Sequence, residues 1–284
     1  MTRAGARERI LGPGEYRDLA LSHDGRRLAY EERDPETGTR DIWVADIARM
    51  QPWRISSHPG DDTGPVWSAD DRTIYYVSNR DGRYQFQRRS ADGTGGELLL
   101  FDDSARITPY GIVGSLFSFS RMDQQRDSDV WMTSLAGESP ASARKPLRTT
   151  EYRESEPQIS PDGKWFTYSS TDTGHRQVYI ESLATPGPRW QVSGQNGREP
   201  QWRADGKELF FHGHERMLEA APVDLSVMPP RIGTPQPLFE LKFRGWDTRY
   251  HYVPSPDGHW FILNSPAEGS HPVPVTVVMN WPSR

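Results

Sequence analysis

The chain has 284 residues and a formal net charge of −5, with 25 glycines, 24 prolines and no cysteine. The lack of cysteine excludes disulfides, thiolate metal sites and cysteine nucleophiles, and the basic residues are too scattered to predict a nucleic-acid partner. No apolar run approaches the length of a membrane span, so direct membrane insertion is not expected.

A short phrase, Ser-x-Asp-Gly or a close variant, recurs along the chain. Its spacing is roughly 40–50 residues, with one interval of about twice that length, and a period in this range is typical of repeat folds. Asp-Gly favours a tight hairpin turn, because glycine adopts positive φ without strain and the aspartate side chain bonds the turn backbone. The phrase occupies residues 22–25, 68–71, 160–163, 203–206 and 255–258.

Each phrase lies between two short runs rich in aromatic and β-branched residues, which predict strands. In the fourth unit these runs are residues 157–159 and 165–168, and two further runs follow at 177–180 and 190–192. Four short strands in each period predict one blade of a β-propeller. The aromatic residues that recur in the third run are expected to pack between blades: Trp43, Phe86, Trp131 and Tyr179.

The third unit lacks the phrase but keeps its other strands. Counting one period from Asp70 leads to Leu116, and the nearby Gly114 is the expected turn residue. The third-strand run that contains Trp131 is intact, so a blade is still predicted here.

The sequence therefore predicts one all-β domain, a six-bladed β-propeller with four-stranded antiparallel blades. The last unit offers three strands, and residues 7–11 form an unpaired run that is expected to pair with residues 275–278 and close the ring. The predicted blades are approximately 14–57, 58–103, 104–150, 151–194, 195–243, and 244–284 completed by 5–12, within a single domain 1–284.

Several stretches resemble the TolB-like, WD-type β-propeller repeats of bacteria. Their order and the tail are similar to the propeller that lies C-terminal to the kinase domain in membrane-bound bacterial serine/threonine kinases. The resemblance implies a sensor or scaffold domain in a periplasmic or other extracytoplasmic location. The stretches are residues 14–22 (Gly-Glu-Tyr-Arg-Asp-Leu-Ala-Leu-Ser), 41–44 (Asp-Ile-Trp-Val), 61–68, 200–210 and 275–281.

The kinase motifs themselves are absent. Residues 1–14 also lack the apolar core of a signal peptide, so the chain as written is expected in the cytoplasm. A targeting sequence upstream, in a longer protein, would reconcile this expectation with the resemblance.

A candidate ligand site follows from the register of the repeats. The residue six positions before each turn aspartate should start the innermost strand, at one mouth of the central channel. A ring of carboxylates there would attract a cation, an amine or a basic peptide. Alternatively, these carboxylates only bond backbone amides in the loops between blades. The candidate ligand-binding residues are Asp18, Asp62, Glu156, Glu199, Asp247 and His251.

A metal site is not expected, and neither is a cofactor. The weak candidates are His212 and His214, which strand alternation would place on one face. The alternative is a polar hairpin tip turned by Gly213.

Two functions remain open from the sequence. The first is a non-catalytic module, a monomer that binds a protein, a peptide or a small ligand. The second is a propeller enzyme, a lyase or hydrolase with its site in the channel. The chain lacks a Gly-x-Ser-x-Gly motif, and only His251 among the histidines is expected at the channel mouth, so the sequence favours a module that is not an enzyme.

Overall fold

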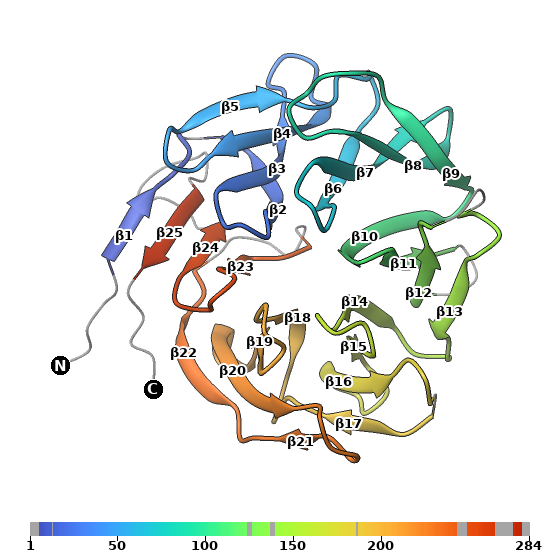
Figure 1. Ribbon diagram of the computed structural model, residues 1–284, viewed down its shortest axis with the longest axis vertical. Coiled ribbons are helices and arrows are strands. Elements are labelled where there is room, and N and C mark those ends of the chain that lie inside the picture. Colours follow the sequence, from blue (N-terminus) through green and yellow to red (C-terminus); the bar gives the residue numbers. More distant parts are fainter. Residues whose placement is uncertain are drawn as a thin grey trace.

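The computed structural model describes residues 6–12, 14–123, 127–136, 140–185, 187–242, 249–264 and 275–279. Their strands form small antiparallel sheets that are arranged radially around a central axis (Figure 1). The predicted all-β propeller with four-stranded antiparallel blades is confirmed. Among the described residues, no helix is long and apolar enough to cross a membrane.

Five blades are each formed by one continuous stretch of chain, with the innermost strand first. The fifth blade carries a 3-10 turn, η1 (His214–Arg216), and an additional short strand, β21 (Arg231–Ile232). The other strands of the five blades are β2 (Tyr16–Leu21), β3 (Arg27–Arg33), β4 (Arg40–Asp46) and β5 (Gln51–Arg54); β6 (Asp62–Trp67), β7 (Thr73–Arg80), β8 (Arg83–Ser90) and β9 (Leu98–Asp103); β10 (Arg106–Val113), β11 (Leu116–Met122), β12 (Asp129–Ser134) and β13 (Lys145–Arg148); β14 (Glu154–Ile159), β15 (Trp165–Ser170), β16 (Gln177–Ser182) and β17 (Arg189–Gln191); and β18 (Arg198–Trp202), β19 (Glu208–His212), β20 (Met217–Asp224) and β22 (Gln236–Glu240).

A sixth sheet is composed of both ends of the chain. From the inside outward it contains β23 (Tyr252–Pro254), β24 (Phe261–Asn264), β25 (Val275–Met279) and β1 (Ala6–Arg9). The predicted pairing of the two chain ends is present, with Arg7 opposite Val278 and Arg9 opposite Thr276. Of the six predicted blades, five are continuous in sequence, and the sheet at the place of the predicted split blade is shared between the two ends of the chain.

The Ser-x-Asp-Gly phrase forms the predicted hairpin turn. In the fourth blade, the Ser160 hydroxyl donates to Asp162 Oδ1 at 2.5 Å, and the N–H of Gly163 donates to the Ser160 carbonyl at 2.8 Å. Gly163 has φ +71°, a conformation in which a Cβ would be strained. In the third blade, Gly114 at φ 58° turns the chain between β10 and β11, as predicted.

The innermost strands share a bulge near their start. The pairing of β2, β6, β14 and β18 with the next strand shifts register at this point. The bulge holds Asp18, Gly64, Glu156 and Glu199 at φ 44°, 67°, 62° and 55°. Three of these residues are therefore non-glycine residues in the left-handed region, where a side chain costs energy unless its contacts compensate.

Aromatic side chains fill the space between blades. Phe86 of β8 stacks on Phe117 of β11 with ring centroids 4.1 Å apart, which joins the second blade to the third. At the junction of the chain ends, Ile10 and Leu11 lie in one core cluster with Leu28 and Ile262. The continuous core therefore includes the shared sheet.

Candidate functional site

The predicted carboxylates at the bulge are bonded to backbone amides of neighbouring blades. Glu156 Oε2 accepts the N–H of Glu199 at 2.7 Å, and Glu199 Oε2 accepts the N–H of His251 at 2.9 Å. Asp18 Oδ1 accepts the N–H of Arg249 at 2.5 Å. All three side chains are buried. Each carboxylate therefore accepts a hydrogen bond from the next blade, and we call such a bond a latch. This is the alternative role, bonding backbone amides, that the sequence left open.

The second blade has Gly64 at the same position and receives its latch from another strand. Its N–H donates to Glu31 Oε1 of β3 at 2.7 Å. Burial and the neighbouring Asp18 raise the pKa of Glu31 well above its usual range.

The remaining members of the predicted ring do not complete a carboxylate mouth. Asp62 is fully buried and lies 3.8 Å from Arg80. Burial raises the pKa of Asp62 to about 6, although the Ser78 and Ser56 hydroxyls partly oppose the shift. Asp247 lies outside the described residues.

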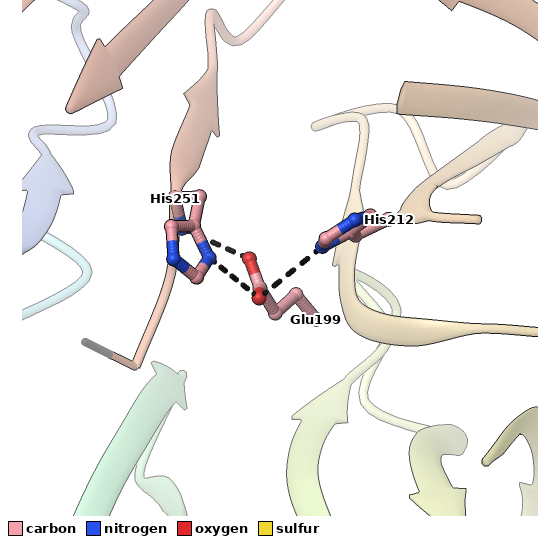
Figure 2. A group of neighbouring side chains, drawn as sticks. All are labelled: Glu199, His212 and His251. Carbon is pink, nitrogen blue, oxygen red and sulfur yellow. Dashed lines mark hydrogen bonds and ion pairs between the residues drawn. The ribbon is translucent and has the colours of Figure 1, made fainter. Parts of the chain in front are cut away.

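Glu199 is the centre of a buried cluster that sequence reasoning predicted only in part (Figure 2). Its Oε1 lies 2.8 Å from Nδ1 of His251 and 3.6 Å from Nδ1 of His212. The three residues come from β18, from the end of β19 and from the position just before β23, and each is at most 3% exposed. Candidate metal-ligand atoms of all three lie within 4.8 Å of one another.

The electrostatics of this cluster favour an ionised carboxylate. Burial by itself raises the pKa of Glu199, but hydrogen bonds and positive charge from His212 and His251 lower it to about 2. The Tyr252 hydroxyl donates to the backbone carbonyl of Glu199 at 2.6 Å and fixes the local chain. A buried anion is thus held between two imidazoles.

The structure does not bring the weak candidates His212 and His214 together, in agreement with the alternative of a polar hairpin tip. Gly213 turns the chain, and the His214 side chain is about half exposed and lies 3.6 Å from Glu215. His212 instead faces inward and joins Glu199. The strand register accounts for the contact between His212 and Glu199, because His212 lies opposite Arg198, the residue before Glu199.

The opposite end of the channel contains a cavity of about 390 Å³, here called the funnel. Its rim is formed by the hairpin turns, and its walls by the far ends of the innermost strands. Its floor is Arg249 with Tyr110, Tyr250 and Gln158. Wall and rim residues include Leu21, Ala69, Ile112, Ile159, Trp202 and Val253.

Arg249 closes the floor by crossing the channel. Its guanidinium donates to the carbonyls of Pro65 and Pro109, and it lies 5.7 Å and 5.4 Å from the ring centroids of Tyr110 and Tyr250. The residue is 7% exposed, and its Nε has no hydrogen-bond partner among the described residues. Sequence reasoning did not identify this role of Arg249, because its partners come from other blades.

Comparison with known proteins agrees with the fold. No family model matches the chain. The structure is similar to TolB from Acinetobacter baumannii (TM-score 0.70, 18% identity), over 89% of this chain and 63% of that one, so the chain spans less than two thirds of that TolB.

It is also similar to an oligogalacturonate lyase in complex with manganese (TM-score 0.61, 13% identity), over 97% of this chain and 93% of that one. A puromycin-hydrolyzing peptidase from Mycobacterium tuberculosis matches over 88% of this chain and 43% of that one (TM-score 0.62, 15% identity). The resemblance to TolB-like β-propellers is confirmed at the level of the fold.

Proposed function

We propose that the chain is a six-bladed propeller that acts as a non-catalytic binding module, with the shared sheet as its sixth blade. Its ligand is a peptide or protein segment, and its binding site is the funnel. In this proposal the domain is the sensor or scaffold part of a bacterial signalling or TolB-like protein and works outside the cytoplasm. The observation that carries the proposal is the open cavity of about 390 Å³ on the face formed by the hairpin turns.

The chemistry of the funnel indicates what it binds. Leu21, Ile112, Ile159 and Val253 give apolar walls, which gain from burying an apolar or aromatic side chain. The floor contains the positively charged Arg249, so a ligand whose tip carries a negative or negatively polarised group is favoured. The funnel thus takes the place of the carboxylate ring as the proposed binding site. A cationic partner is no longer proposed, because the carboxylate oxygens accept backbone N–H groups.

The proposal is tested by closing the funnel. Peptides are selected from a displayed random library against the full chain, and their affinity is measured by the fluorescence of Trp67 and Trp202, which line the cavity. Ala69→Trp at the exposed rim should weaken binding at least ~10-fold, because it fills the opening. The control is Leu99→Trp on the outer strand β9, where Leu99 is about half exposed. Equal affinity of the wild type and Ala69→Trp would refute the funnel as the site.

A propeller enzyme is the second candidate, and the buried cluster around Glu199 favours it. A carboxylate beside two imidazoles is a group that acid–base chemistry uses, and one similar structure is an oligogalacturonate lyase. The burial of all three residues leaves a substrate no approach, so we prefer the binding module. Release of unsaturated product from an oligogalacturonate by the wild type, lost in Glu199→Gln, would reverse that preference.

A further inference from the structure

We propose that Glu199, His212 and His251 form a site for one divalent transition-metal ion, of which zinc is the best match. The site lies between the fifth blade and the shared sheet (Figure 2). It is separate from the funnel and has a structural role, since it joins the fifth blade to the inner edge of the shared sheet.

The distances suit a small ion. Ligand atoms that bind zinc at ~2.0–2.1 Å in a tetrahedral arrangement lie ~3.3–3.4 Å apart. The two separations from Glu199 Oε1, 2.8 Å to His251 Nδ1 and 3.6 Å to His212 Nδ1, fall on either side of that value. The candidate ligand atoms of all three residues lie within 4.8 Å of one another, so binding requires the two imidazole rings to adjust around the ion.

The donor set is also appropriate. Two imidazole nitrogens and one carboxylate oxygen are ligands that zinc and its neighbours in the first transition row accept. An ion bound here replaces the hydrogen bond between Glu199 and His251, so Nδ1 of His251 binds without a proton, and any proton it carried moves to Nε2 or to solvent. The positive ion then compensates the buried carboxylate, which is costly to bury without a counter-charge.

Neighbouring hydrogen-bond donors fix the orientation of Glu199. Its second oxygen is fixed by the N–H of His251, and its backbone carbonyl is fixed by the Tyr252 hydroxyl. Oε1 is thereby directed at the two rings. Such outer partners orient the ligands of metal sites, and their loss alone lowers metal affinity ~10–100-fold.

The experiment uses the full chain after treatment with a chelator. Zn²⁺ is titrated by calorimetry, and Co²⁺ is added separately to obtain a visible absorption spectrum that reports nitrogen and oxygen ligands. We expect one equivalent of either ion and an increase in melting temperature. Glu199→Gln and His212→Leu should each bind at least ~100-fold more weakly, because a direct ligand matters more than an outer partner.

The matched control is His214→Ala, two residues from His212 but on the surface. It should bind as the wild type does, and so should Ala69→Trp, which closes the funnel without touching the cluster. If His212→Leu does not fold, Glu199→Gln with a native near-ultraviolet circular dichroism spectrum decides. The proposal is overturned if the wild type binds no stoichiometric ion, if Glu199→Gln binds like the wild type, or if His214→Ala loses binding.

Discussion

Replacement of Glu156 by alanine should destabilise the propeller without affecting the funnel. Glu156 accepts the N–H of Glu199 at 2.7 Å, the Ser169 hydroxyl at 2.7 Å and the Arg176 guanidinium at 3.0 Å. The alanine removes the acceptor for all three. The fourth and fifth blades then lose their latch at the start of the innermost strands.

The magnitude follows from the burial of each donor. The Glu199 N–H is enclosed, and a buried unsatisfied donor costs ~1–3 kcal/mol. The Ser169 hydroxyl keeps the nearby Ser155 hydroxyl as a partner, so its loss is about 0.5–1 kcal/mol. The Arg176 side chain is 24% exposed and reaches water, so its share is at most about 1 kcal/mol. Together these give a loss of about 1.5–5 kcal/mol.

A second substitution separates the latch from the backbone strain. Glu156 has φ 62°, and glycine adopts this conformation without the cost of a Cβ. Glu156→Gly should therefore be about 1 kcal/mol more stable than Glu156→Ala, the reverse of their usual order. Gly64 shows that glycine is accepted at the equivalent position of the second blade.

Urea unfolding followed by tryptophan fluorescence measures these differences. The control is Glu15→Ala, whose side chain is 59% exposed, and its free energy of unfolding should stay within ~0.5 kcal/mol of the wild type. A wild-type unfolding free energy for Glu156→Ala would refute the latch. An alanine variant more stable than the glycine variant would refute the strain argument.

Three further outcomes are expected. Asp162→Ala should lose about 1 kcal/mol in urea unfolding, because the turn bonds to Ser160 and Lys164 disappear; unchanged stability would contradict the turn role. Deletion of residues 1–12 should cost about 4–8 kcal/mol, since it removes the β1–β25 pairing and the buried Ile10 and Leu11; an unchanged melting temperature would contradict ring closure. For Asp62, the folded-state pKa of about 6 lies above the usual aspartate value of 3.8, so the folded protein binds the proton more tightly and stability falls as pH rises from about 4 to 6. Asp62→Asn should remove about 2–3 kcal/mol of that fall, and a pH dependence identical to the wild type would refute the assignment.

The architecture could be predicted from the sequence because it repeats. Each Ser-x-Asp-Gly phrase carries its own turn chemistry, as the bonds around Ser160 and Gly163 show, so one phrase identifies one hairpin without knowledge of the rest. Gly114 could be predicted in the same way once the spacing was known. Counting from the turn also placed Glu156, Glu199 and His251 at equivalent positions in their blades.

The roles of those residues could not be predicted, because they depend on contacts between blades. Whether Glu156 faces the channel or the next blade is decided by the bulge and its left-handed backbone, which the sequence does not reveal. Arg249 forms the funnel floor only because Pro65 and Pro109 present their carbonyls from two other blades. The contact of His212 with Glu199 could not be predicted for a related reason, since strand alternation along one chain segment does not show which side chains of another strand lie beside it.

The bulge also explains why the two mouths of the channel differ. A left-handed residue interrupts the alternation of a strand, so its side chain reaches the neighbouring blade rather than the channel. Where the second blade has Gly64, Glu31 supplies the missing oxygen from β3, so the position requires the bond between blades and not a particular residue. At this mouth of the channel, the carboxylates therefore hold neighbouring blades together. In our proposal, ligand recognition takes place instead on the turn face, where the funnel has apolar walls and Arg249 at its floor.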